Sequence, residues 1–500
     1  MSRFKTIYFP DYMTGDAGGA GLTIPFSDHE EKLHNAVSRL SSYTIRSVIG
    51  HNLYSDVKRA AEGAGLAVST YMRRSLERVV PIAESDYDAR KDNAIQSTFV
   101  GGKGSPLHDW FPYLEGYSPD FVRAVLEKYT PNAKSVFDPF CGSGTTALTA
   151  ASMGLMAAYC EVNPVCQDVI NAKSIAVEST AERRLDLSRR LSELSEDLHF
   201  LVGQQSPDPG LENTYRESFG ERPFFDAGTY NLVLRLRALA DSVLGSDKRL
   251  GRLLEVAILG ALVPSSLLVR RGDLRFRSLA ELSRHRPDVI ALVISRLRLM
   301  SSDLQDVEFA AHRAVMVGAD ARCLETERVG VVDAVVTSPP YLNGTNYFRN
   351  TKIELWFQRH LTCKKDLRGF RDSAVTAGIN DVTGSKTRTG SVPVISLLQE
   401  TLGMLEKSTY DKRIPMMVSA YFSEMDRVIE KLRLICHDDT RVSIDLGDSC
   451  YGEVWVRTDI ILREIMYQRG FCLIDEVVLR ERQSRDGRRL KQTLQVFKVK

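Results

Sequence analysis

The chain lacks several features that mark common classes of protein. No apolar run approaches the roughly 18 residues that a membrane span needs. The first residues, MSRFKTIYFPDYMTGD, lack the apolar core of a signal peptide. The eight cysteines include no CxxC pair and no Cys/His cluster. We therefore expect a protein of a reducing compartment, with no membrane contact, no disulfide framework and no metal site.

The chain also lacks a strong charge of either sign. It carries 66 Lys and Arg against 64 Asp and Glu, a formal net charge of +2. Overall charge therefore neither requires nor excludes a polyanionic partner. The composition, 43% hydrophobic and 26% charged, is that of a globular chain. Because 500 residues exceed one ordinary core, we expect one large α/β domain with additions.

A glycine-rich turn is the first feature that points to a ligand. The stretch AKSVFDPFCGSGTTALTA predicts a buried strand that ends in Asp138, a tight turn and the start of a helix. Gly142 and Gly144 let the backbone approach a ligand closely, and Thr145 and Thr146 are expected to cap the helix. An acid here is unfavourable for pyrophosphate, which prefers bare amides. It suits a ligand that carries an ammonium group.

Two further strands are predicted to end in acids. GLMAAYCEVNP predicts a strand that ends at Glu161, the position at which a βαβ unit binds ribose hydroxyls. AVMVGADARCL predicts another that ends at Asp320. Each acid alone also suits a helix cap or a salt bridge. Three acids at the ends of successive strands favour a shared ligand site, because ligands of open α/β sheets bind at the carboxyl ends of the strands.

The stretch TSPPY follows the apolar run VVDAVV and leaves its strand in an unusual way. Pro339 and Pro340 fix φ and remove two N–H donors, so the loop presents its carbonyl groups rigidly. Ser338 adds a hydroxyl, and Tyr341 adds a face on which a base can stack, worth about 1–3 kcal/mol. The structural alternative is a rigid turn with a buried tyrosine.

Taken together, these stretches resemble the S-adenosylmethionine-dependent amino-methyltransferases of DNA. DPFCGSGTT is similar to the cofactor motif of that family, CEVNP to its ribose acid, GAD to its adenine-side acid and TSPPY to its catalytic motif. Upstream, HDWFPYLEGYSPDFVRAVLEKY resembles the segment that completes the cofactor pocket. The resemblance covers roughly 105–175 and 312–500. The cofactor-binding residues that it implies are Tyr117, Ser118, Asp138, Pro139, Phe140, Cys141, Gly142, Ser143, Gly144, Thr145, Thr146, Glu161 and Asp320.

The resemblance also implies a fold. We expect an α/β protein of the class I methyltransferase (Rossmann-like) type, with a seven-stranded sheet whose last strand is antiparallel. The C-terminal stretch predicts two strands joined by a polar turn at 485–488. The expected parts are an N-terminal extension (1–100), a cofactor-binding part (101–175), a helical insertion (176–311) and a catalytic part (312–500).

The chemistry that the resemblance implies is methyl transfer to an exocyclic amine. Such an amine is a poor nucleophile, so it must be held in line with the methyl group by hydrogen-bond acceptors. Ser338 and the carbonyl of Pro339 are the candidates, with Pro340 and Tyr341 completing the catalytic set. The base must be flipped out of the duplex.

In this family a serine at the first position of the tetrapeptide goes mainly with cytosine N4, and Asp or Asn with adenine N6. Ser338 therefore predicts cytosine-N4 methylation of double-stranded DNA, in restriction–modification or a related defence system. The implied enzyme is cytoplasmic, prokaryotic or phage-associated, and monomeric or dimeric, with a cognate restriction endonuclease as a partner. Adenine-N6 methylation, RNA guanine-N2 methylation and a DNA-binding regulator without a cofactor remain as alternatives.

Three segments are candidates for DNA contact. LLVRRGDLRFRS, within the insertion, carries Arg270 and Arg271. The segment 361–392 is rich in Lys, Arg, Gly, Ser and Thr, and is expected to be ordered by phosphates. Its candidates are Lys364, Lys365 and Arg368. The alternative is a solvated loop between helices for the first segment and a disordered surface loop for the second.

The third segment, 43–80, resembles a ribbon-helix-helix unit, which binds DNA as a dimer. In that interpretation Arg46 faces the bases and Ser69 caps the second helix. The alternative is a two-helix addition to the catalytic domain.

Overall fold

The computed structural model describes residues 4–7, 22–25, 105–113, 116–306, 312–342, 347–382, 395–409, 411–483 and 489–500. The chain divides into two compact units, Met1–Ala89 and Arg90–Lys500. In the first unit, β1 (Phe4–Ile7) pairs with β2 (Leu22–Pro25) in antiparallel orientation. The unit predicted for 43–80, with Arg46 and Ser69, lies outside the described residues.

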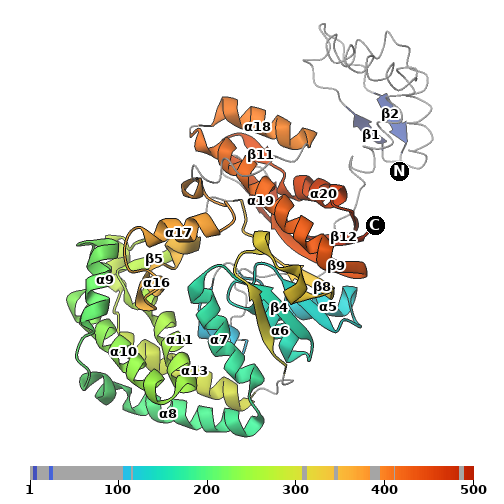
Figure 1. The fold of residues 1–500 in the computed structure, drawn as a ribbon. Coiled ribbons are helices and arrows are strands. Elements are labelled where there is room, and N and C mark those ends of the chain that lie inside the picture. Colours follow the sequence, from blue (N-terminus) through green and yellow to red (C-terminus); the bar gives the residue numbers. More distant parts are fainter. Residues whose placement is uncertain are drawn as a thin grey trace. The chain divides into compact units, whose positions relative to one another are not determined.

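A seven-stranded sheet organises the second unit (Figure 1). In spatial order its strands are β12 (Phe471–Gln483), β13 (Arg489–Val499), β9 (Cys436–Gly447), β8 (Val332–Thr337), β3 (Ser135–Asp138), β4 (Met156–Cys160) and β7 (Ala314–Gly318). Neighbours from β9 to β7 are parallel, whereas β13 is antiparallel to both β9 and β12. This is the class I methyltransferase topology, so the predicted fold is confirmed. The strand order reverses between β3 and β8, and α/β proteins bind ligands at such a point.

Side-chain alternation along the strands creates two cores, one on each face of the sheet. Val136 of β3 and Ala334 of β8 belong to one buried cluster, and Phe137 and Val335 belong to the other. The first face is covered by α5 (Pro119–Tyr129), α6 (Thr145–Ser152) and α7 (Pro164–Glu178). The second is covered by α18 (Ser396–Ser408), α19 (Arg413–Ile435) and α20 (Thr458–Gln468).

The long segment between β4 and β7 is mostly helical, but it also contains a β-hairpin. Its elements are α8 (Ala181–Gly203), α9 (Pro209–Phe219), α10 (Ala227–Ser246), α11 (Lys248–Ser265), β5 (Leu268–Arg271), β6 (Asp273–Phe276), α12 (Leu279–Arg284) and α13 (Val289–Asp306). β5 and β6 pair in antiparallel register around Gly272. Sequence reasoning did not predict this hairpin. No helix within the described ranges is long and apolar enough to cross a membrane.

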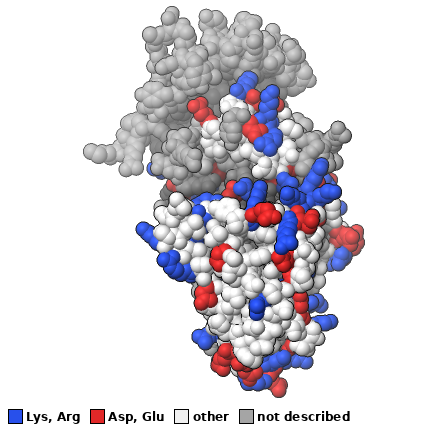
Figure 2. All heavy atoms as spheres, turned by 90° about the vertical axis from the view of Figure 1, so that its left-hand side faces the viewer, with Lys and Arg blue, Asp and Glu red and all other residues white. Residues whose placement is uncertain are grey.

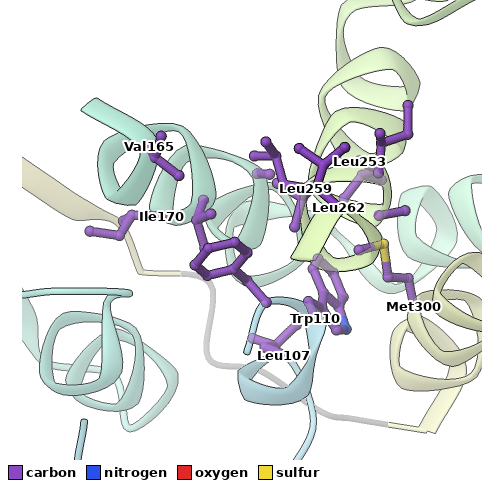
Figure 3. Close-up of a cluster of buried hydrophobic side chains, with 14 of the residues drawn as sticks. Leu107, Trp110, Val165, Ile170, Leu253, Leu259, Leu262 and Met300 are labelled. Carbon is purple, nitrogen blue, oxygen red and sulfur yellow. The ribbon is translucent and has the colours of Figure 1, made fainter. Parts of the chain in front are cut away.

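The insertion shares its core with the sheet domain. Figure 3 shows Trp110, from η4 (His108–Trp110), beside Leu262 of α11 and Met300 of α13. The carboxylate of Asp303 on α13 accepts hydrogen bonds from Leu107 N (2.8 Å) and Trp110 Nε1 (2.7 Å). The insertion is therefore packed firmly against the segment that precedes α5.

The segment that follows the TSPPY loop differs from its prediction. Residues 361–392 were expected to be ordered by phosphates, whereas α17 (Asp366–Ser373) and η6 (Ile379–Asp381) already form regular structure within their first part. Asp366, the first residue of α17, accepts hydrogen bonds from Thr362 N and Cys363 N, which holds the turn that precedes the helix. Residues 383–392 lie outside the described ranges. The remaining elements are η5 (Ala321–Cys323), α14 (Thr326–Val329), α15 (Tyr347–Asn350), α16 (Lys352–Phe357), β10 (Ser449–Tyr451) and β11 (Val454–Val456).

Candidate active site

A cavity of about 380 Å³ lies at the carboxyl ends of β3, β4, β7 and β8. Asp138 ends β3, Glu161 directly follows β4, Asp320 lies two residues after β7 and Ser338 directly follows β8. The parallel strands thus bring one residue each to the same edge of the sheet. The predicted site residues that line the cavity are Tyr117, Asp138, Pro139, Phe140, Cys141, Gly142, Ser143, Thr145, Glu161, Asp320, Ser338, Pro339, Pro340 and Tyr341.

Three predicted cofactor residues, Ser118, Gly144 and Thr146, are not among those that line the cavity. Ser118 is the N-cap of α5, where its hydroxyl accepts a hydrogen bond from Phe121 N at 3.1 Å. The hydroxyl of Thr146 donates to Val336 O at 3.2 Å. Both side chains therefore support the site from behind rather than facing a ligand.

The predicted helix cap after the glycine-rich turn is wrong. α6 begins at Thr145, and its N-cap is Gly144, which has no side chain to accept a hydrogen bond. The φ of Gly144 is +95°, and a Cβ there would lie 2.9 Å from the side chains of Ile170 and Leu148. Glycine is thus required both by the backbone conformation and by the packing. The position cannot carry the threonine cap that we expected.

Asp138 connects the glycine-rich turn to the TSPPY loop. Its Oδ1 accepts hydrogen bonds from Phe140 N at 2.9 Å and from Thr337 Oγ1 at 2.7 Å. Burial raises the pKa of this carboxyl to about 6, although both hydrogen bonds act in the opposite direction. The strands β3 and β8 are therefore joined at the point where the strand order reverses.

Glu161 holds the glycine-rich turn in place. Its carboxylate accepts hydrogen bonds from Gly142 N at 2.6 Å and from Asn163 N at 2.8 Å. Burial raises the pKa of Glu161 to about 8. Gly142 adopts a φ of +55°, and a Cβ there would lie 3.0 Å from the ring of Tyr113. The turn is closed from one side by the acid and from the other by an aromatic ring.

Asp320 lines the cavity, and its carboxylate is already paired with a guanidinium. Arg322 binds the carboxylate of Asp320 through Nε (2.9 Å) and Nη2 (2.7 Å), and the same guanidinium pairs with Glu424 at 3.1 Å. Asp320 Oδ1 also accepts from Arg322 N, which caps η5. Asp320 is therefore suited to accept hydrogen bonds rather than to bind a second cation.

The side chain of Tyr341 is fixed by residues of two distant strands. Its hydroxyl donates to Asp445 Oδ2 on β9 at 2.8 Å and accepts from Gln492 Nε2 on β13 at 2.9 Å. A Cβ at Gly447 would lie 3.4 Å from the Tyr341 ring, so the ring packs against the backbone of β9. Burial and the nearby Asp445 carboxylate raise the pKa of Tyr341 well above its usual value. Tyr341 N donates to the hydroxyl of Tyr347 at 3.2 Å.

Sequence reasoning missed several residues of the site. Tyr113, Asn163, Gly272 and Tyr347 line the cavity but were not singled out. The sequence carried a signal for Asn163, which precedes Pro164 and caps α7 by accepting from Val165 N. Gly272 reaches the site from an unpredicted hairpin, and no local pattern indicates such a contact.

The basic candidates for DNA contact fall into two groups. Arg270 donates to Glu354 Oε1 at 2.7 Å and to Asn350 O at 2.8 Å, and its side chain is 10% exposed. It is therefore held within the protein, and we withdraw it as a DNA contact. Four candidates have exposed side chains: Arg271, Lys364, Lys365 and Arg368.

Comparisons with known proteins place the chain beside characterised enzymes. No protein-family model matches it. It is 22% identical over 444 residues to M.BsoBI of Geobacillus stearothermophilus, a match that covers 79% of this chain and 84% of the relative. It is 23% identical over 414 residues to M.AvaI of a Nostoc species, covering 76% and 82%. Both are type II methyltransferases.

A solved structure was also found. The chain matches the crystal structure of TrmN from Thermus thermophilus with 12% identity and a TM-score of 0.25. The match covers 79% of this chain and 52% of that one. A score this low carries no argument, so the fold assignment rests on the strand order of the sheet.

Proposed function

We propose that the chain is an S-adenosylmethionine-dependent DNA methyltransferase that methylates the N4 amine of a flipped-out cytosine. The observation that carries this proposal is the shared cavity, which is lined by Asp138 and Glu161 together with Ser338 and Tyr341. Similarity to two type II methyltransferases over most of the chain supports the same reaction class and a role in restriction–modification. A cognate restriction endonuclease is the partner that this role implies.

The residues of the cavity fit S-adenosylmethionine. Asp138 and Glu161 are two buried carboxyl groups, which suit the ammonium group and the ribose hydroxyls of that cofactor. At Gly142 the backbone comes close to the cavity with no side chain between. When bound, the cofactor supplies an activated methyl group, so the site needs no strong base.

The TSPPY loop accounts for how the amine is held. Ser338 is partly buried at the cavity wall, and its hydroxyl can accept a hydrogen bond from one amino hydrogen. The carbonyl of Pro339 can accept the other. Two acceptors draw the nitrogen lone pair out of conjugation with the ring and toward the methyl group. The amine loses one proton to solvent as the new C–N bond forms and the S–C bond breaks.

Tyr341 supplies a stacking surface for the extruded base. Its ring lines the cavity, while its hydroxyl is occupied by Asp445 and Gln492. The ring is thus prevented from turning, and its face stays available to a planar ligand. The choice of cytosine over adenine rests on Ser338, in a position where the adenine-specific relatives implied by the motif carry Asp or Asn.

The test is expression in a bacterial host that lacks endogenous DNA methylation. Genomic DNA is digested to nucleosides and analysed by mass spectrometry, and the modified sites are then mapped by sequencing. We expect N4-methylcytosine at one short recognition sequence, and much less of it from cells that express Ser338→Ala at the same level. N6-methyladenine in its place would contradict the base assignment. Labelled methyl groups that enter tRNA but not DNA would contradict the substrate class.

A further inference from the structure

The β5–β6 hairpin is fastened to the helix that follows the catalytic loop. Asn350, the last residue of α15, is buried, and its side chain bridges the turn of the hairpin. Its Nδ2 donates to Gly272 O at 2.8 Å, and its Oδ1 accepts from Leu274 N at 2.9 Å. One amide side chain thus satisfies a backbone acceptor and a backbone donor on the two sides of the turn. This contact fixes the position of the turn relative to α15.

Arg270 provides a second attachment. Its guanidinium bonds to Asn350 O and to the buried carboxylate of Glu354 on α16. It also reaches Pro112 O at 3.4 Å, in the segment before α5. A buried ion pair with several hydrogen-bond partners holds its geometry more rigidly than a surface pair. The hairpin is therefore fastened to both sequence segments that flank the cavity.

This attachment places the tip of the hairpin at the cavity mouth. Gly272 lines the cavity and is also exposed to solvent, so it lies at the rim. The neighbouring side chain of Arg271 is 71% exposed, and its ion pair with Glu281 is long, at 3.7 Å. The guanidinium of Arg275 binds both oxygens of that same glutamate at 2.8 and 2.9 Å. Of the two arginines, Arg271 is thus held less tightly by Glu281, and it lies next to the mouth of the cavity.

α17 packs against the same short helix. The rings of Phe348 on α15 and Phe370 on α17 stack with centroids 5.2 Å apart and planes inclined by 17°. Phe348 also lines the cavity. At the start of α17, the side chains of Lys364, Lys365 and Arg368 are exposed. Within the described part of the chain, none of the three has a carboxylate within 4.0 Å.

The face that carries both elements shows gathered basic side chains. Figure 2, which looks onto the side where β5 and α17 are labelled in Figure 1, shows Lys and Arg with some acids across the middle of the molecule. Clusters of exposed cations beside an active site attract a polyanionic substrate and raise its rate of association. The near-zero net charge of the whole chain makes this local clustering informative.

We propose that the tip of the β5–β6 hairpin and the start of α17 form a DNA-binding surface at the cavity mouth. Arg271, Lys364, Lys365 and Arg368 contact phosphates of the strand that carries the extruded nucleotide. This proposal rests on the proposed function, and it assigns to an insertion between β4 and β7 a direct role in substrate binding. Asn350 couples that insertion to the catalytic loop, because α15 contacts both.

The test compares Arg271→Ala and the triple variant Lys364→Ala/Lys365→Ala/Arg368→Ala with the wild type. Binding is followed by fluorescence anisotropy with two labelled duplexes, one carrying the mapped recognition site and one scrambled, at salt concentrations between about 50 and 200 mM. Arg189→Ala on α8 is the matched control, because it removes a similarly exposed arginine (63% against 71% for Arg271) from a helix that does not line the cavity. Titration with S-adenosylmethionine checks that each variant retains a folded site.

We expect Arg271→Ala to weaken binding of both duplexes about equally. The slope of the logarithm of the binding constant against the logarithm of the salt concentration should become shallower by about 1. The triple variant should reduce it by about 2–3, and the control should match the wild type. Unchanged affinity for DNA and an unchanged salt slope in both variants would overturn the proposed DNA-binding surface. If only the duplex with the recognition site is bound more weakly, and the salt slope is unchanged, the side chains contact bases rather than phosphates. That result would overturn the proposed phosphate contacts. A wild type that methylates no DNA would instead refute the proposed function itself.

Discussion

The phenol of Tyr341 and the carboxylate of Asp445 are joined by a hydrogen bond of 2.8 Å across 104 residues of sequence. Gln492 Nε2 donates to the hydroxyl of Tyr341 and to both oxygens of Asp445, each at 2.9 Å. Asp445 is 2% exposed, so its acceptors are directed at these two partners rather than at water. The relationship fixes the orientation of the ring that we expect to stack on the base.

Asp445→Ala should lower kcat by about 100-fold, because misplacing a positioning group by roughly 1 Å has an effect of that size. The dissociation constant of S-adenosylmethionine should stay unchanged. Asp445→Asn keeps one acceptor and should recover most of the activity. Single-turnover methylation measures these rates. In a Tyr341→Phe background the alanine substitution should have little further effect, and independent, additive losses would show that Asp445 acts otherwise.

Ser338 and Asp138 should affect different steps. We expect Ser338→Ala to lower kcat by about 100-fold, because it removes a group that acts mainly in the transition state. Asp138→Ala should raise the dissociation constant of S-adenosylmethionine by about 10-fold or more, because a hydrogen-bonded charge is lost. Calorimetric titration and steady-state kinetics separate the two effects.

The Asp138→Ala variant needs a control, because Asp138 also accepts a hydrogen bond from Thr337 Oγ1. Thr337→Val removes the same hydrogen bond while keeping the carboxylate. It should leave cofactor affinity close to that of the wild type. Equal losses of affinity and turnover in both Ser338→Ala and Asp138→Ala would contradict the division of roles.

Cofactor affinity should depend on pH through Glu161. In the free protein burial raises its pKa to about 8, so the carboxyl is mainly protonated at neutral pH. Hydroxyl donors of a bound ribose stabilise the ionised form, so binding below pH 8 releases a proton. Affinity should therefore rise as pH rises toward 8, by at most about tenfold per pH unit. Calorimetry in buffers of different ionisation enthalpy measures the proton release, and Glu161→Gln should abolish it. Tighter binding at lower pH would contradict this role.

Because the amine of Lys173 is buried, we expect the free energy of unfolding to increase at alkaline pH. Its side chain is fully buried on α7, and its Nζ donates to Ser143 O of the glycine-rich turn at 3.1 Å. Burial lowers the pKa of this amine to about 8, so the unfolded chain binds more protons than the folded chain between pH 8 and its ordinary value of 10.5. The contribution of Lys173 to the free energy of unfolding should therefore increase across that pH range, by up to about 1.4 kcal/mol per pH unit.

Denaturant unfolding at about pH 7.5 and about pH 9.5 measures this effect, with Lys173→Met as the reference. The free energy of unfolding of the wild type, relative to that of the variant, should be larger at the higher pH. A constant difference between the two proteins would show that Lys173 keeps an ordinary pKa in the fold.

Local pattern predicted the parts of the site that a single strand and turn create. Asp138 ends an apolar strand, Glu161 and Ser338 each directly follow one, and parallel pairing alone brings such positions to one edge. Ser118 stays a predicted cofactor residue, but its hydroxyl caps α5 before Pro119, a role that the family motif does not reveal. Asp320 was predicted as the adenine-side acid, but its pairing with Arg322, two residues later, was not predicted.

Contacts between distant segments were beyond local pattern. Nothing near Tyr341 indicates Asp445 or Gln492, because the antiparallel pairing of β13 with β9 brings those residues together. The attachment of Gly272 to Asn350 spans 78 residues and depends on how an insertion packs. Three expectations stay predictions: the division of the chain into four parts, a site without a metal and the ribbon-helix-helix unit.

The central claim is that one cavity holds both the methyl donor and the amine. A crystal structure with a non-reactive amine analogue of S-adenosylmethionine, in which an amine replaces the methyl sulfonium, tests it most directly. The account predicts density against Asp138 and Glu161, with the substituting amine directed at Ser338 and Pro339. Density bound elsewhere, or an amine that points away from the TSPPY loop, would contradict the account.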